Sequence, residues 1–528
     1  MGLPDLQLSL PQVLAALGIP LAVLYTFTRL SRRRSELPLP PGPPKRFLLG
    51  NLLDIPKEFP YVTYTNWGKE YDSDILHVQA GKTSLIIINS FEAANALLEK
   101  RSLIYSSRKQ STLLGKLVGW GWIMSALPYG DHWRRSRSLF QRHFNTHKDA
   151  IHHPRQMRFV RGYLLPKLLE GSDRVDQIVR HMVGGLSLSV AYGIRIKREN
   201  DPYVHLGEAA VDGLVQAGTP GRYLVDSIPI LRYIPSWFPG AGFQEEVRRW
   251  REFQEGLHEK PFHEALRLIE ESEGAQSSFV ATCLGNISET SPDKQYRHEL
   301  IKDVAAVIFA AGVDTLAASV EAFFLAIASH PEVRRRAQAE LDKVVGADRL
   351  PTIEDMEELP FITAIVKETL RWVLALPARV PHFLTEDDTY KGYHIPKNSI
   401  VVGNAWAMLR NEEDYPEPDT FKPERFLNAD GSLNPNVRDP ATAAFGFGRR
   451  MCPGKDYAFS IVWLAAASVL SSFDVVDVTD ENGVTTDPGK IPFRTGIVRH
   501  PDHFRIKFKA RSRTVEELID GEEERFQG

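Results

Sequence analysis

The chain has 528 residues, in which 64 lysines and arginines nearly balance 67 aspartates and glutamates, for a formal net charge of -3 at pH 7. It lacks the basic excess by which proteins bind nucleic acid, so a nucleic-acid partner is not expected. Its two cysteines exclude a disulfide framework and a multi-cysteine metal site, which indicates a reducing compartment and leaves each cysteine to be explained by itself.

The first predicted element is an N-terminal membrane anchor over residues 1–30. Residues 10–28 carry no charge. This uncharged run is almost as long as the roughly 20 residues that a helix needs to cross a bilayer. Arg29 and the arginines at 32–34 follow, so this end is expected on the cytoplasmic side. A secretory signal peptide would instead carry its positive charges before the apolar run. A buried core helix is the alternative, which the terminal position and the arginines disfavour.

A basic, proline-rich hinge is predicted over residues 31–50. Five prolines lie between Pro38 and Pro44, and such a segment favours an extended polyproline conformation. It would form a stiff spacer between the anchor and a globular body over residues 51–528.

The body begins with strand-like segments and continues with helical ones. Residues 74–89 predict two strands joined by a turn at Gly81-Lys82, and a helix is expected from about Phe91. Between residues 299 and 329, apolar residues recur at helical spacing. That run is too long for an ordinary surface helix and predicts a central one.

Two further segments complete the pattern. Residues 349–373 predict a turn followed by a helix, and residues 390–408 predict strands with a turn at 396–398. No second linker follows the proline-rich segment, so the sequence predicts one large domain, mainly α with small β-sheets. We also find no glycine-rich nucleotide loop after a strand, so the chain has no obvious nucleotide site of its own.

The stretch FGFGRRMCPG places one cysteine among glycines and arginines, where a buried free cysteine would normally have apolar neighbours. The residues Phe445, Gly448, Arg450, Cys452 and Gly454 form the pattern FxxGxRxCxG. Glycines allow a loop to approach a flat cofactor and to direct amide groups at a sulfur, for which Gly454 and Lys455 are the candidates. The arginine supplies positive charge for a carboxylate, and a helix starting after the cysteine favours a thiolate.

This pattern is the haem-binding signature of the haem-thiolate monooxygenases, and the chain resembles a cytochrome P450 over almost everything after residue 38. Four further motifs stand in the family's order: WRRSR at 133–137, AGVDT at 311–315, ETLR at 368–371 and PERF at 423–426. The resemblance implies the cytochrome P450 fold, a single large haem domain over residues 51–528 behind an N-terminal transmembrane helix. It also implies haem b with the Cys452 thiolate as the axial ligand of the iron.

The resemblance assigns a role to each motif. Trp133, Arg137, His382 and Arg450 would bind the haem propionates, and Phe445 and Gly454 would shape the cysteine loop. Glu368 and Arg371 would pair with Arg425 in a structural network behind the haem. Ala311 and Gly312 would leave room for dioxygen, and Asp314 and Thr315 would relay protons. The family commonly has Thr or Ser after this pair, but here Leu316 follows.

The predicted function is oxidation of a small apolar or aromatic substrate by an enzyme of the endoplasmic reticulum membrane, single-pass, with a cytosolic catalytic domain. Electrons would come from NADPH-cytochrome P450 reductase, with cytochrome b5 as a second donor, at a face formed by Arg134, Arg135, Arg142 and Lys455. The resemblance is strongest to fungal members in secondary metabolism, whose substrates include terpenoids, indoles and polyketides. Specificity segments are expected at Leu113–Met124 and Gly213–Ser236.

Two alternatives stay open. The same scaffold supports isomerases, dehydratases and peroxygenases, which tend to lose the acid-alcohol pair that is intact here. A haem sensor or electron carrier without a substrate is the alternative of another class.

Overall fold

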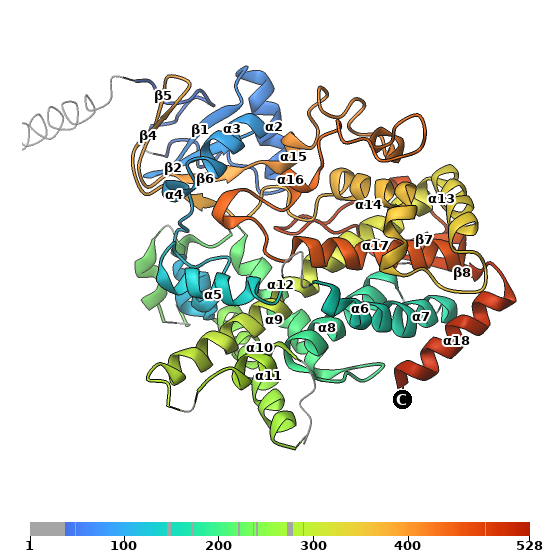
Figure 1. Ribbon diagram of the computed structural model, residues 1–528. Helices are drawn as coiled ribbons and strands as arrows, with labels where there is room; N and C mark the ends of the chain where they lie inside the picture. Colours follow the sequence, from blue (N-terminus) through green and yellow to red (C-terminus); the bar gives the residue numbers. More distant parts are fainter. Residues whose placement is uncertain are drawn as a thin grey trace, which may run out of the picture.

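A computed structural model gives the arrangement of the chain (Figure 1). It describes residues 37–47, 49–144, 149–171, 174–219, 222–226, 228–235, 237–238, 241–271, 278–288, 290–480 and 482–527. The predicted membrane anchor over residues 1–30 lies outside the described residues, as do the first six residues of the predicted hinge.

The largest sheet has four strands in the order β1-β2-β6-β3 and lies at the upper left of Figure 1 beside α2 (Pro60–Glu70). Its strands are β1 (Ile75–Ala80), β2 (Thr83–Ile88), β3 (His382–Phe383) and β6 (Ile400–Gly403). Strand β2 is antiparallel to β1 and parallel to β6, and β3 is antiparallel to β6. The predicted hairpin is therefore confirmed, with its turn at Gly81 in the left-handed region, φ +57°.

Two small antiparallel pairs complete the β-structure. They are β4 (Asp388–Tyr390) with β5 (Tyr393–Ile395), and β7 (Phe473–Asp480) with β8 (Phe504–Ala510). The predicted turn before β6 is confirmed, since Asn398 adopts φ +67° between β5 and β6. Asparagine tolerates this left-handed conformation better than most residues.

Helices make up most of the molecule and fill the centre and the right of Figure 1. The longer ones are α5 (Asp131–Gln141), α8 (Val175–Tyr192), α9 (Pro202–Gly218), α10 (Phe243–Glu271), α13 (Pro331–Val344), α14 (Pro360–Trp372), α17 (Lys455–Ser472) and α18 (Arg513–Gln527). The shorter ones are α3 (Phe91–Ala94), α4 (Ser102–Tyr105), α6 (His153–Phe159), α7 (Leu165–Glu170), α11 (Phe279–Gly285), α15 (Ala405–Met408) and α16 (Ala441–Ala444).

The predicted central helix is confirmed as α12, which spans Lys294–Ser329 and contacts α5, α8, α9, α10, α14 and α17. Among the described helices it is the one long and apolar enough to cross a membrane, yet 78% of its most apolar window is buried inside the protein. A helix that is apolar on all sides belongs in a core when other helices surround it. α12 ends at Ser329 because Pro331 begins α13.

The described part of the proline-rich segment lies against the sheet. The Pro38 carbonyl accepts the His394 amide at 2.7 Å, and the Pro41 carbonyl accepts the His77 amide at 2.9 Å. A β-carbon on Gly42 would lie 2.3 Å from the His77 carbonyl oxygen, so only glycine permits this approach. The described prolines are therefore docked on the body, and they do not form the predicted spacer that stands away from it.

Candidate active site

The signature cysteine lies in a glycine-rich loop that ends at the start of α17. Gly446 and Gly448 have φ of +96° and +55°, a region that other residues rarely adopt. A β-carbon on Gly448 would also lie 2.4 Å from the Leu98 carbonyl oxygen. The Cys452 amide donates to the Phe445 carbonyl at 2.7 Å. These constraints fold the FxxGxRxC stretch into a closed loop.

The Cys452 sulfur accepts a hydrogen bond from an amide, but its surroundings as a whole do not favour the thiolate form. The residue is half-buried, and the Gly454 backbone amide hydrogen-bonds to its sulfur. Burial raises the pKa of the Cys452 thiol, while Gly454 and the charges of Arg137 and Arg379 oppose that rise. The loop amide thus lowers the pKa of the Cys452 thiol, as predicted, but burial raises this pKa by more. A metal ion deprotonates a coordinating thiol outright, so a bound metal would complete the thiolate.

Arg450 is anchored by backbone groups beside Trp133. Its Nε, Nη1 and Nη2 donate to the carbonyl oxygens of Ser106 at 2.6 Å, Met124 at 3.1 Å and Leu127 at 2.6 Å. Its guanidinium carbon lies 4.3 Å from the centroid of the Trp133 ring. Burial, together with the charge of Arg137, lowers the pKa of Arg450 to about 9.

Arg137 follows Trp133 by one turn of α5 and reaches the cysteine loop. Its Nη1 donates to the carbonyl oxygen of Met451, the residue before Cys452. Burial lowers the pKa of Arg137, and the charge of Cys452 opposes this shift. The structure therefore brings the predicted residues Trp133, Arg137 and Arg450 to one side of Cys452.

Two arginines that the sequence analysis missed, Arg108 and Arg379, lie near His382. The His382 Nδ1 hydrogen-bonds to the Tyr105 carbonyl oxygen at 2.9 Å. Burial, with the charges of Arg108, Arg379 and Arg450, lowers the pKa of His382. Burial also lowers the pKa of Arg108 and brings that of Arg379 to about 10. Neither arginine belongs to a motif, so no sequence signal pointed to them.

Several N–H groups of the buried arginines have no hydrogen-bond acceptor among the described residues. Among the residues that the structure describes, no hydrogen-bond partner exists for Arg108 Nη1, Arg137 Nε, or Arg379 Nε and Nη2. Buried guanidinium groups without partners are costly unless an anion completes them. A haem carries two carboxylates, so this cationic shell next to a half-buried cysteine fits that cofactor.

The middle of α12 is uncovered although the helix is otherwise mostly buried. Ala311 is exposed, and Gly312 and Thr315 are half-buried. The Thr315 hydroxyl donates to the Ala311 carbonyl at 2.7 Å. A β-carbon on Gly312 would lie 2.8 Å from the Ser187 hydroxyl of α8, so the glycine also permits close helix packing. Ala311 and Thr315 therefore lie on an uncovered stretch of α12, whereas Gly312 allows α8 to pack closely.

Asp314 has different partners from its neighbour Thr315. Successive helix residues are rotated by about 100°, and the buried Asp314 carboxylate pairs with Arg180 and His500, each at 3.1 Å. Burial raises the pKa of Asp314, but the hydrogen bonds and charges of His500 and Arg180 outweigh burial and lower it overall. Among the described contacts, none joins the Asp314 and Thr315 side chains directly.

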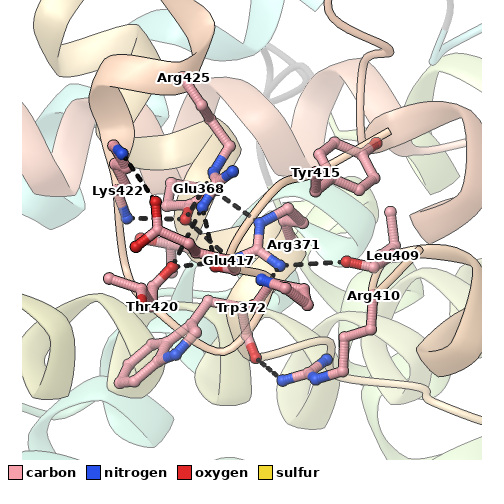
Figure 2. Close-up of polar contacts among 12 residues, drawn as sticks. Glu368, Arg371, Trp372, Leu409, Arg410, Tyr415, Glu417, Thr420, Lys422 and Arg425 are labelled. Carbon is pink, nitrogen blue, oxygen red and sulfur yellow. Dashed lines mark hydrogen bonds and ion pairs between the residues drawn. The ribbon is translucent and has the colours of Figure 1, made fainter. Parts of the chain in front are cut away.

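The predicted network around Glu368 is confirmed (Figure 2). Arg371 donates to both Glu368 oxygens, at 2.7 and 2.9 Å, and both side chains are fully buried. Arg425 adds a bond to Glu368 at 3.2 Å, and the Lys422 amide adds one at 2.8 Å. Arg371 also donates to the carbonyl oxygens of Leu409, Pro418 and Thr420. The network ties α14 to the segment that leads to the cysteine loop.

The two predicted specificity segments contact each other. Asp226 accepts hydrogen bonds from the Ser111 hydroxyl at 2.9 Å and from the Leu113 amide at 3.0 Å. Trp122 stacks on His258 of α10, with ring centroids 4.4 Å apart. The first specificity segment is thus joined to the second by hydrogen bonds and to α10 by ring stacking.

The cytochrome P450 family model matches residues 40–508. The chain belongs to the cytochrome P450 family. It is 42% identical to cytochrome P450 monooxygenase ple1 of Rhodocybe pseudopiperita over 96% of each chain. It is 41% identical to cytochrome P450 monooxygenase 98 of Postia placenta, over 93% of this chain and 94% of that relative. Tryptamine 4-monooxygenase of Psilocybe cyanescens is 38% identical, over 96% of this chain and 99% of that relative.

Membership settles the fold class and the class of chemistry. This cytochrome P450 is an oxidoreductase of the monooxygenase type, and the family binds haem through a cysteine thiolate. The mainly helical architecture with small sheets agrees with that assignment. Enzymes of this family act on small molecules with electrons from a redox partner.

Proposed function

We propose that this cytochrome P450 inserts oxygen into a small apolar or aromatic substrate in fungal secondary metabolism, with Cys452 as the axial ligand of haem iron. The observation that carries the ligand assignment is the shell of buried, incompletely bonded arginines around half-buried Cys452. The other cysteine, Cys283, has no such surroundings: burial raises the pKa of its thiol to about 12. When bound, thiolate-ligated haem supplies dioxygen activation and an oxidising iron centre.

The residues of the chain would hold the cofactor at two places, the cysteine loop and the arginine shell. The Gly454 amide would stabilise the Cys452 thiolate, and the Phe445 carbonyl would keep the loop closed. The haem carboxylates would take up the free donors of the arginine shell. These free donors belong to the predicted Arg137 and to Arg108 and Arg379, which the structure adds. The predicted Trp133, His382 and Arg450 lie beside them and would complete the propionate site.

Proton supply is proposed to run along α12. Ala311 and Gly312 would leave room for dioxygen beside the helix, and Thr315 lies in the same uncovered stretch. Asp314 would pass protons inward and Thr315 would hold the last donor in place. The intact acid-alcohol pair favours a monooxygenase over the isomerase, dehydratase and peroxygenase alternatives.

Electrons are proposed to enter on the face formed by α5 and the start of α17. Arg134, Arg135 and Arg142 are exposed on this side of α5, and Lys455 is half-buried at the first position of α17. Basic side chains would steer an acidic surface of NADPH-cytochrome P450 reductase or cytochrome b5 to this face.

Membrane attachment is proposed for the N-terminal segment, which would place the catalytic domain on the cytosolic side of the endoplasmic reticulum. The described body supports contact with lipid because large apolar side chains are exposed in two separate segments. They are Phe47 and Leu53 near the proline-rich segment, and Leu224, Ile230, Tyr233 and Trp237 after α9. These exposed side chains are proposed to be the part of the body that contacts lipid.

The substrate class rests on the connected specificity segments and on the relatives. Trp122 and its partner segment present aromatic and apolar side chains near α9 and α10. Tryptamine 4-monooxygenase is named for an indole amine, which supports an indole among the candidate substrates. Terpenoids and polyketides are the other proposed classes. A screen of such compounds for shifts of the haem Soret band would identify which class binds.

Cys452→Ser tests the ligand assignment. We expect the variant to lose the red-shifted Soret band of the reduced carbon monoxide complex, because a serine hydroxyl does not replace a thiolate donor. Cys283→Ser is the matched control and should keep that band. Retention of the band in Cys452→Ser, or its loss in Cys283→Ser alone, would refute the assignment.

A further inference from the structure

A second charged cluster is buried beside α12. It comprises Arg180 from α8, Asp314 and Glu321 from α12, and His500 from the segment between β7 and β8. Their side chains are 19%, 10%, 1% and 7% exposed, respectively. Asp314 and Glu321 are two turns apart, so both carboxylates lie on one face of the helix.

The ring of His500 bridges the two carboxylates. Its Nε2 lies 3.1 Å from Asp314 Oδ1, and its Nδ1 lies 2.8 Å from Glu321 Oε2. A carboxylate accepts hydrogen bonds, so both ring nitrogens must carry a hydrogen to satisfy this geometry. The arrangement therefore selects the positively charged imidazolium form of His500.

The cluster is balanced in charge only in that form. Arg180 lies 3.1 Å from Asp314 and 3.9 Å from Glu321, so two cations face two anions. The Arg180 Nη2 also lies 3.3 Å from His500 Nε2, so the two carboxylates must offset the repulsion between the two cations as well. Burial lowers the pKa of His500, but Glu321 and Asp314 outweigh burial and raise it to about 8. The other charged groups acting on the cluster are Arg494 towards Glu321, and Glu208 and Asp176 towards Arg180.

Loss of the His500 proton would leave an unbalanced negative charge in the interior, which is strongly unfavourable. The Asp314 carboxylate would then have Arg180 as its only cationic partner within the cluster. Its orientation would be less restricted, and its affinity for protons would increase. His500 also sits on a short closed loop, because the Arg494 amide donates to its carbonyl oxygen at 2.9 Å.

We propose that His500 is a positioning residue for proton supply, which holds the Asp314 carboxylate in a fixed orientation behind the uncovered stretch of α12. This inference rests on the proposed role of Asp314 and Thr315 as the proton relay. It adds a residue that lies 186 positions from Asp314 in the sequence. His500 acts through Asp314, and no contact between His500 and Thr315 is found among the described residues.

Proton supply can be measured without a substrate. Dioxygen that takes two electrons and two protons leaves as hydrogen peroxide, at one NADPH per peroxide. Dioxygen that takes four electrons and four protons becomes two waters, at two NADPH per dioxygen. The peroxide formed per NADPH therefore rises when protons reach the distal oxygen less efficiently.

The experiment uses the full-length holoenzyme with its reductase and compares wild type, His500→Gln, His503→Gln and Thr315→Ala from about pH 6 to about pH 9. Glutamine can keep a donor near Asp314 but carries no charge. His503 is the control, because it lies in the same segment and pairs with Asp176 at 2.9 Å. Its replacement reaches the cluster only indirectly, through the charge of Asp176 on Arg180. Two quantities are measured, the peroxide formed per NADPH and the Tm of thermal unfolding. The Tm reports on the ion pairs of His500 with Asp314 and Glu321 and does not depend on dioxygen reduction.

For His500→Gln we expect a severalfold higher peroxide yield below pH 8, converging with wild type above it, where His500 loses its proton. The Tm difference between the two proteins should be largest below pH 6.5 and shrink as the pH rises through about 8. Unchanged peroxide yield and Tm profile in His500→Gln would overturn the inference, as would an equal effect in His503→Gln.

Failure of the proposed relay would be seen separately. If Thr315→Ala keeps the wild-type peroxide yield while His500→Gln raises it, the relay through Thr315 is wrong and the positioning role of His500 stands. If Thr315→Ala raises the yield and His500→Gln does not, the relay stands and the role of His500 is wrong.

Discussion

Arg371 provides the sharpest test of what stabilises the haem domain. In the Arg371→Met variant an uncharged side chain replaces a fully buried guanidinium group. The equally buried Glu368 is left with one cationic partner, Arg425 at 3.2 Å. Two hydrogen bonds to Glu368 and three to backbone carbonyls disappear. Breaking a buried ion pair by removing one partner typically costs about 3–5 kcal/mol.

That cost is a large fraction of the roughly 5–15 kcal/mol by which a domain is usually stable. We therefore expect Arg371→Met to lower the urea midpoint strongly and to reduce the yield of the red-shifted carbon monoxide complex. Arg248→Met in α10 is the matched control, because Glu245 precedes Arg248 by three residues at 2.8 Å but both side chains are exposed. Such a surface pair contributes about 0–1 kcal/mol.

Glu368→Leu combined with Arg371→Met supplies the second arm. Removing both charges leaves no uncompensated carboxylate, so the double variant should lose less free energy of unfolding than the two single variants together. The reasoning would be refuted if Arg371→Met lost no more stability than Arg248→Met, or if the two single losses added fully.

The remaining predictions concern the proton relay and the anchor. Thr315→Ala should leave haem binding intact and raise the peroxide formed per NADPH, because the hydroxyl in the uncovered part of α12 is lost. Thr315→Ser is its control, and equal peroxide yields in both variants would contradict the relay. Deleting residues 1–30 should move much of the protein to the soluble fraction with haem still bound, which fractionation and the Soret band would test. Protease protection of the body inside the lumen would instead contradict the predicted topology.

Local spacing determined a large part of this protein before any tertiary structure was considered. Glu368 and Arg371 share a helix face because side chains three residues apart do so in any α-helix, and the structure confirms their pairing. The length of the run with apolar residues at helical spacing predicted a central helix, because it is too long for an ordinary surface helix. The cysteine loop could be identified because its glycines, arginine and cysteine lie within ten residues.

Tertiary structure alone decided which distant groups meet. Arg108 and Arg379 come from separate segments and converge near His382, and Asp314 meets His500 instead of Thr315. The proline-rich segment was predicted as a stiff spacer, but its docking on β1 and β5 depends on hydrogen bonds that its carbonyl groups accept from the His77 and His394 amides. Periodicity fixes the direction of a side chain relative to its own helix or strand. It carries no information about which other element will lie there, because that depends on how all the helices pack together.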